Sequence, residues 1–371
     1  MDRDMNTVRF GMVGCGVIAR MHARALQHSP HARLAAVTDL RPEAARAFAD
    51  EQNIPTVHRD AASLLADPQV DAVVLAMPVK GRTQLALEVL AAGRHLLLEK
   101  PAAMNAEEVL QIMAARDAAR PHGGGDRLHV AGCSSRHRFL PSAEKATEVV
   151  ASGALGPLRV VRGRAVLPAG APPKSPPPVW RVRKDLNGGG IMSNWGVYDL
   201  DYLLGVCGWS LVPRQVLGQV WSVSPAFADR VAEGSNAETH VAALVQCAGG
   251  TVITLERGEF VPTVRETAWQ IIGERGALRM NLLPGDQNQL WLDQADPATG
   301  VVSSLVWEGA ETWEMAHNGP AADLAEAIVQ DRPPRTTLEQ ALVIQRLTDA
   351  IYASAETGQA VACETAALAG R

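Results

Sequence analysis

The sequence lacks the cysteine and histidine spacings that build disulfide frameworks or zinc sites. Its five cysteines lie far apart in 371 residues, and none forms a C-x-x-C pair. Ten histidines occur without an H-E-x-x-H or related spacing. We therefore expect reduced thiols and no metal site.

Long apolar runs and clusters of basic residues are also lacking. No uninterrupted apolar stretch reaches the length of a bilayer span, and the first ten residues, MDRDMNTVRF, contain no apolar signal core. The net charge of −5 gives no electrostatic support for binding nucleic acid or an anionic membrane. We expect a cytoplasmic protein, and its length and its 47% hydrophobic content favour two globular domains.

The first third of the chain alternates apolar runs with amphipathic segments. Strand-like runs occupy the start of 7–26 and then 33–40, 70–78, 94–101 and 127–132, and helical patterns occupy the rest of 7–26, 44–52 and 83–93. Continuous apolar strands that alternate with helices indicate a parallel sheet covered on both faces.

A glycine-rich turn follows the first of these strands. It has the G-x-G-x-x-A form, in which Gly14 permits a tight turn, Gly16 lets a pyrophosphate approach the backbone, and Ala19 lets the helix pack closely. Asp39 ends the next strand, where a carboxylate accepts hydrogen bonds from ribose and repels a 2′-phosphate. The pattern predicts a site for NAD. Arg41 leaves NADP open, because a guanidinium binds phosphate; a solvent-facing arginine is the alternative.

Two later strands end in proline at the edge where ligands bind in such sheets. The first end places Met77 and Pro78 near the expected nicotinamide site, and the second fixes Lys100 between Glu99 and Pro101. A surface lysine is the alternative reading, but this position favours a catalytic role. The predicted cofactor-binding residues are Gly14, Gly16, Val17, Ile18, Ala19, Asp39, Arg41, Met77, Pro78, Glu99 and Lys100.

The segment GGGIMSNWGVYDLD, 188–201, places three polar side chains on one helical face. Asn194, Tyr198 and Asp201 are spaced by four and three residues, and their neighbours are largely apolar. A solvated face is the ordinary explanation for such a stripe. Because so little of this helix is polar, we instead expect the stripe to face a ligand.

The second half of the chain is rich in short β-type runs. Eight of them occur, at 158–167, 216–224, 239–248, 251–259, 268–274, 277–283, 289–295 and 301–307, mostly without helices between them, which favours antiparallel pairing. A final helix is predicted after Thr336, with Thr336 and Glu339 in capping-box spacing and Gly358 at its end.

Several stretches resemble one enzyme family. The segments 14–26, 87–108 and 138–158, the triple-glycine helix and the C-terminal 350–361 are similar to the glucose-fructose oxidoreductase, inositol dehydrogenase and rhizopine-catabolism family. The resemblance implies an α/β fold with a Rossmann dinucleotide-binding domain at 1–133. It implies a substrate-binding and oligomerisation domain at 134–371 with a large open, mainly antiparallel sheet, and a homodimer or homotetramer formed through that sheet.

The chain departs from the family pattern at three polar positions. Asn194 stands where relatives usually have Asp, Tyr198 where they usually have His, and Arg82 where they usually have another His. Some relatives resemble this chain in using a tyrosine as the proton donor or acceptor beside the lysine of the Glu-Lys-Pro motif. The resemblance therefore implies hydride transfer between nicotinamide and a secondary alcohol or ketone of a sugar, polyol or related cyclic alcohol.

In this interpretation Tyr198 is the acid/base and Lys100 assists it, because an adjacent ammonium favours the phenolate and a developing alkoxide. Asn194 can hydrogen-bond a sugar hydroxyl, and Asp201 can orient the substrate or the lysine. The predicted catalytic residues are therefore Lys100, Tyr198, Asp201 and Asn194. The alternative is a catalytically silent nucleotide-binding protein, regulatory or sensory, on the same fold. Weaker candidates for substrate contact are Trp180, Arg181, Trp195 and His317, for which solvated, core or capping roles are the alternatives.

Overall fold

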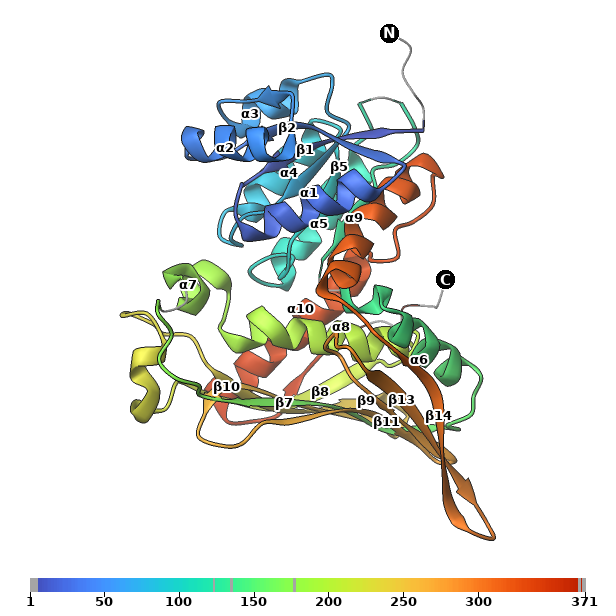
Figure 1. The fold of residues 1–371 in the computed structure, drawn as a ribbon. Helices are drawn as coiled ribbons and strands as arrows, with labels where there is room; N and C mark the ends of the chain where they lie inside the picture. The colour runs from blue at the N-terminus through green and yellow to red at the C-terminus, as the bar shows by residue number, and fades with distance from the viewer. Residues whose placement is uncertain (1–5, 123, 134–135, 176–177, 366–367, 369–371) are drawn as a thin grey trace. The chain divides into compact units, whose positions relative to one another are not determined.

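A computed structural model describes residues 6–122, 124–133, 136–175, 178–365 and 368. The chain divides into two compact units (Figure 1). The first unit comprises residues 1–136 and 314–342, and the second comprises 137–313 and 343–371. In the part of the chain that the structure describes, no helix is long and apolar enough to cross a membrane.

The first unit is built on a six-stranded parallel sheet. Its strand order is β3-β2-β1-β4-β5-β6, the doubly wound arrangement in which the chain reverses direction between β1 and β4. This confirms the predicted parallel sheet. The strands are β1 (Val8–Val13), β2 (Ala32–Thr38), β3 (Thr56–Val57), β4 (Ala72–Leu75), β5 (His95–Leu98) and β6 (Val130–Gly132).

Helices cover both faces of this sheet, and alternate strand residues fill the two cores. Phe10, Val74 and Leu97 pack with α1, α2 and α9 on one face, whereas Leu75 and Leu98 pack with α3, α4 and α5 on the other. The helices are α1 (Val17–His28), α2 (Pro42–Gln52), α3 (Ala61–Ala66), α4 (Arg82–Ala91), α5 (Ala106–Ala118) and α9 (Trp313–Val329).

The second unit is built on a nine-stranded sheet with the order β14-β13-β12-β11-β7-β10-β9-β8-β15. Every pairing is antiparallel except β7 with β10. Each of the eight predicted β-type runs overlaps a strand. The strands are β7 (Leu158–Pro168), β8 (Pro213–Trp221), β9 (His240–Cys247), β10 (Val252–Val261), β11 (Glu266–Gly273), β12 (Gly276–Met280), β13 (Asn288–Asp296), β14 (Gly300–Gly309) and β15 (Val361–Ala362).

Helices lie along one face of this sheet (Figure 1). They are α6 (Pro141–Ala151), a π-helical turn (Met192–Gly196) that leads directly into α8 (Val197–Val206), and the second part of α10 (Leu338–Thr357). The short helix α7 (Lys184–Asn187) precedes the π-helical turn. On β9 the residues that face the helices are buried, whereas Leu244 on the opposite face is 47% exposed.

Two predictions about the C-terminal helices are wrong in detail. The capping box of α10 is formed by Thr337 and Gln340, one residue later than predicted, because each backbone N–H of this pair is bonded by the other's side chain. The sequence pattern also predicts a helix that starts near Pro320 with His317 before it, but α9 already begins at Trp313 and contains Pro320. A proline in the sequence was therefore read as a helix start when it lies inside a helix.

Candidate functional site

The glycine turn after β1 uses its two glycines for different purposes. Gly14 has φ +97°, and a Cβ at this position would lie 2.4 Å from the Ala76 carbonyl oxygen, so the fold itself requires glycine here. Gly16 has ordinary backbone angles, and a Cβ there would meet no atom of the described residues within 4 Å. The space above Gly16 is therefore open for a ligand.

The start of α1 leaves its first backbone N–H groups available. Gly16 is the N-cap and supplies no side-chain hydrogen bond, Val17 is 77% exposed, and Ala19 is fully buried against the sheet. Ile18 is partly buried between them. Uncapped N–H groups at a helix N-terminus attract an anionic group. The turn and the helix start therefore fit the pyrophosphate of a dinucleotide.

Asp39, at the end of β2, holds the same turn. Its carboxylate accepts hydrogen bonds from the backbone N–H groups of Cys15 at 2.8 Å and Arg41 at 2.9 Å. The Arg41 guanidinium is exposed and lies 3.6 Å from the same carboxylate. Asp39 thus places a negative charge next to the glycine turn, as the NAD prediction requires, and also partly neutralises Arg41.

The loops after β4 and β5 carry the remaining candidates of the first unit. Met77 is partly buried and Pro78 is exposed, and Lys100 is partly exposed at the end of β5. The Lys100 backbone N–H donates to the carboxylate of Glu99 at 3.0 Å. Lys100 therefore stands on a backbone that its own neighbour fixes.

The Glu99 side chain is buried inside the first unit. One carboxylate oxygen bonds the His22 imidazole at 2.8 Å and the Arg136 guanidinium at 2.9 Å. Burial alone would raise the pKa of the Glu99 carboxyl, but Arg136 and His22 hold it well below its usual range. We therefore interpret the Glu99 side chain as one that positions its neighbours, and its contact with the cofactor stays a prediction.

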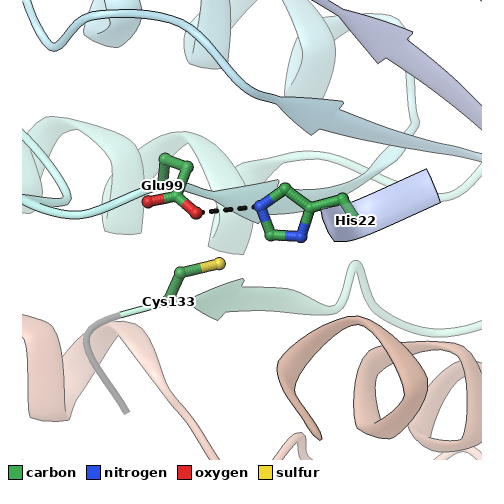
Figure 2. A group of neighbouring side chains, drawn as sticks. All are labelled: His22, Glu99 and Cys133. Atoms are coloured by element: carbon green, nitrogen blue, oxygen red, sulfur yellow. Dashed lines mark hydrogen bonds and ion pairs between the residues drawn. The ribbon is translucent and has the colours of Figure 1, made fainter. Parts of the chain in front are cut away.

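His22, Glu99 and Cys133 bring three potential metal-ligand atoms within 4.8 Å of one another (Figure 2). These three residues are far apart in the sequence, so the short spacings that identify metal sites could not predict this cluster. The charges around it oppose a cation, because the Arg136 guanidinium already bonds the carboxylate. Burial and the Glu99 charge raise the pKa of the Cys133 thiol well above its ordinary value, which favours the neutral thiol. We interpret the cluster as a buried polar network.

In the second unit Gly188 is required by its backbone conformation, and Gly189 and Gly190 are required by close packing. Gly188 has φ +72° and ends α7. A Cβ on Gly189 would lie 1.8 Å from the Tyr352 hydroxyl, and one on Gly190 would lie 1.9 Å from the backbone oxygen of Glu238. The Glu238 carboxylate in turn accepts hydrogen bonds from the N–H groups of Gly190 and Met192. A buried carboxylate thus anchors the start of the helical segment.

The predicted polar stripe finds protein partners. Asn194 accepts a hydrogen bond from the Asn187 side chain at 3.3 Å and donates to the Arg181 carbonyl at 3.2 Å. Asp201 forms an ion pair with Arg138, and both side chains are largely buried. The π-helical turn also alters the spacing assumed for a regular α-helix. The stripe therefore serves at least in part to hold the helix in the unit.

Tyr198 lies in an aromatic cluster. It is 5% exposed, with the His137 ring edge-on at 5.2 Å and the Trp195 ring at 5.6 Å. Trp313 lies beside both of these neighbours. The buried Arg257 guanidinium stacks over Trp195 at 4.6 Å. Tyr198 is therefore packed among aromatic rings.

Arg257 also connects this cluster to a residue that the sequence pattern did not single out. Asp199 is 1% exposed and bonds the Trp269 indole at 2.9 Å and Arg257 at 3.4 Å. Burial raises the pKa of the Asp199 carboxyl despite Arg257. Asp199 follows Tyr198 directly in the sequence. The one sequence signal that could have identified it is an acidic residue within a largely apolar helical segment.

The weaker candidates occupy separate places. Trp180 is 37% exposed in a short helical turn, and Arg181 beside it is partly exposed. Trp195 belongs to the aromatic cluster. His317 is partly buried within α9, in the first unit.

Family profiles match both halves of the chain. The profile described as "Oxidoreductase family, NAD-binding Rossmann fold" matches residues 8–120. The GFO/IDH/MocA C-terminal domain profile matches residues 143–279. The chain therefore belongs to the GFO/IDH/MocA oxidoreductase family, and NAD is its cofactor. This confirms the resemblance drawn from the glycine turn and the Glu-Lys-Pro motif.

Individual relatives agree with this assignment. D-glucoside 3-dehydrogenase of Escherichia coli is 27% identical over 95% of this chain and 97% of its own length. Myo-inositol 2-dehydrogenase of Thermotoga maritima is 27% identical over 60% of this chain and only 58% of its own length. The structure of a levoglucosan dehydrogenase with NADH and L-sorbose has the same fold, with a TM-score of 0.84 at 19% identity over 97% of this chain and 100% of that chain.

Proposed function

We propose that this protein transfers a hydride between NAD and a secondary alcohol or ketone of a sugar, polyol or related cyclic alcohol. The observation that carries the proposal is the placement of Lys100 at the carboxyl end of β5, next to a backbone fixed by Glu99. In doubly wound sheets this edge is where ligands bind. A partly exposed lysine held there is suited to act on a reacting oxygen.

The protein's residues divide the work of binding and proton transfer. Bound NAD supplies the hydride chemistry. Gly14, Gly16 and the start of α1 hold the phosphates, and Asp39 bonds the ribose. We assign proton exchange with the substrate hydroxyl to the phenol of Tyr198, with the Lys100 ammonium favouring the negatively charged oxygen.

Asn194 and Asp201 support Tyr198 in this proposal. Their side chains have protein partners in Asn187, the Arg181 carbonyl and Arg138. We therefore expect both residues to hold the helix that carries Tyr198, and we assign them no proton transfer. Burial of an amide or a carboxylate without hydrogen bonds is unfavourable, so these contacts stabilise the position of the helix.

The substrate class rests on the relatives and on the aromatic side chains. The named relatives act on a D-glucoside and on myo-inositol, which are both polyhydroxylated rings. Aromatic faces pack well against the C–H surface of such rings. We propose Trp180 and Trp195 as such faces and Arg181 as a hydrogen-bond donor to a hydroxyl or carboxylate. We keep His317 as a weaker candidate.

The decisive experiment is an assay of NAD reduction and NADH oxidation with free sugars, inositols, 3-keto sugars and uronic acids. Nicotinamide absorbance in both directions gives the rate, and NADH fluorescence shows that the nucleotide is bound. Turnover of at least one member is expected. Tight NADH binding without turnover of any member would contradict the proposal and favour the silent nucleotide-binding protein.

We also propose that a second copy of the chain covers the exposed face of the nine-stranded sheet, giving a homodimer or homotetramer. This face carries Leu217, 50% exposed, and Leu244, 47% exposed, around a shallow hollow that also includes Ala242 and Thr254. Apolar side chains gathered on one sheet face favour association.

A further inference from the structure

Arg82 is a buried cation at an unfavourable place. It is 2% exposed and is the first residue of α4, where the partial positive charge of the helix N-terminus opposes a cation. Burial lowers the pKa of its guanidinium to about 10, which still leaves it protonated near neutral pH. A buried charge requires compensating hydrogen bonds.

The compensation comes from three backbone carbonyl groups. One terminal nitrogen of Arg82 donates to the carbonyls of Glu99 and Pro101, and the other donates to the carbonyl of Met77. Glu99 and Pro101 flank Lys100 on either side, and Met77 belongs to the loop after β4. A single planar guanidinium thus joins both loops at the carboxyl edge of the sheet.

From this geometry we infer that Arg82 is a positioning residue that fixes the backbone of Lys100 and of the Met77 loop. The inference deepens the proposed function and rests on it for the role of Lys100. Lysine at position 82 would keep the charge, but it is a point donor that cannot bridge three carbonyls in a plane. A loosened Lys100 would then lose orientation while the glycine turn stays intact.

The chain contains a matched control in Arg94. It is also 2% exposed, and its guanidinium likewise donates to backbone carbonyls, those of Leu65 and Asp67. It directly precedes β5, so it lies at the amino edge of the sheet, away from Lys100. Arg82→Lys and Arg94→Lys therefore make the same chemical change in the same unit, and only the first change touches the carboxyl edge.

The test compares Arg82→Lys and Arg94→Lys with the unsubstituted full-length protein by hydrogen–deuterium exchange with bound NADH. In Arg82→Lys, peptides covering 76–81 and 99–104 should exchange about tenfold faster or more, as expected when hydrogen bonds from a charged donor are lost. In Arg94→Lys, faster exchange should be confined to 65–71. On a sugar from the panel, Arg82→Lys should lower kcat by up to about 10²-fold at similar KM and similar NADH Kd.

Unchanged exchange at 99–104 in Arg82→Lys, or equal acceleration in both variants, would overturn the inference. Faster exchange with unchanged kcat would also overturn it, because Lys100 would then need no positioning. Arg82→Gln, which buries no charge, serves the same comparison if Arg82→Lys does not fold. Lys100→Ala separates the two proposals: if that variant keeps full turnover, the proposed role of Lys100 fails, whereas the exchange results still show whether Arg82 holds the loop.

Discussion

The interiors of the two units are built from different kinds of side chain. All eight tryptophans and all three tyrosines of the sequence lie in the second unit. The first unit packs its parallel sheet with Val, Leu and Ala, and its largest apolar side chains include Phe10 and Phe48. A sheet covered on both faces by helices leaves thin layers that small and branched side chains fill.

The difference extends to the functional residues. In the first unit, the candidates are backbone groups and charged side chains fixed by buried ions, namely Arg82, Glu99 and Arg136. In the second unit, Tyr198 is fixed mainly by aromatic rings. Buried charged groups restrict the conformation of a loop because their hydrogen bonds are directional. Aromatic rings restrict the conformation of a side chain because they pack closely around it. The candidates of the first unit thus lie among buried charges, whereas Tyr198 in the second unit lies among aromatic rings.

The largest effect should come from removing the two side chains, Tyr198 and Lys100, to which the proposed function assigns proton transfer. Tyr198→Phe removes only a hydroxyl from the aromatic cluster, so the fold and the NADH affinity should survive while kcat falls by roughly 10²-fold or more. Lys100→Ala should be comparably damaging. The double variant should cost much less than the product of the two effects, because residues that act as a unit are not additive.

Steady-state kinetics on a sugar from the panel measures this, with NADH fluorescence as the control for binding. Near-normal turnover of Tyr198→Phe would show that the tyrosine hydroxyl takes no part in proton transfer and that the ring only lines the pocket. Fully multiplicative effects would show that Lys100 and Tyr198 act independently.

The second prediction uses glycines to compare the two units. Gly190→Ala should destabilise the second unit by about 3 kcal/mol or more, because the new methyl group collides with the Glu238 backbone. Gly16→Ala should change stability by less than about 0.5 kcal/mol, since a Cβ there meets no protein atom. It should nevertheless weaken NADH binding about tenfold, equivalent to about 1.4 kcal/mol.

Urea unfolding followed by tryptophan fluorescence reports on the second unit, where all the tryptophans lie. Titration with NADH reports on the first. If Gly16→Ala lowers stability and leaves the NADH affinity intact, the glycine serves the fold and the proposed phosphate position is wrong.

The sequence was sufficient for the features that local patterns determine. The alternation of apolar runs predicted the parallel sheet, and the G-x-G-x-x-A turn predicted NAD as the cofactor, because strand period and turn geometry act over a few residues. The β-rich second half predicted the mainly antiparallel sheet for the same reason. The capping box of α10 was misplaced by one residue, because Thr336 and Thr337 both offer a hydroxyl close to a suitable partner.

The contacts that hold the candidate site were not predictable, because they join distant parts of the chain. His22 meets Glu99 across 77 residues, and Glu238 reaches the N–H of Gly190 across 48. Arg82 was noted only as a departure from a family pattern, since nothing in its neighbourhood shows that three carbonyls will surround it. Likewise, the stripe of Asn194 and Asp201 suggested a ligand because their partners, Asn187 and Arg138, lie on other segments.

The smallest predicted effect concerns pH and the stability of the first unit. His95, at the start of β5, accepts a hydrogen bond from the His129 backbone N–H at 3.0 Å through Nδ1, which requires that nitrogen to be unprotonated. Burial, and the neighbouring His129, lower the pKa of the His95 imidazole to about 3, although Asp71 and Asp331 act in the opposite direction. Burial likewise lowers the pKa of His129.

An imidazole whose pKa is lower in the folded state binds protons preferentially in the unfolded state. Its contribution to stability is therefore complete above the unfolded value of 6.5 and is lost as the pH falls toward 3. Between about pH 7 and pH 5 the free energy of unfolding of the first unit should fall by on the order of 1 kcal/mol through His95, which is only partly buried.

His95→Gln keeps an acceptor for the His129 N–H but cannot be protonated, so the free energy of unfolding of this variant should depend less steeply on pH. The exposed His122→Gln is the control and should keep the slope of the unsubstituted protein. Urea unfolding followed by far-ultraviolet circular dichroism at both pH values measures the slopes, since tryptophan fluorescence would report only on the second unit. Equal slopes in all three proteins would show that the strand β5 tolerates a charged imidazole and would contradict the prediction.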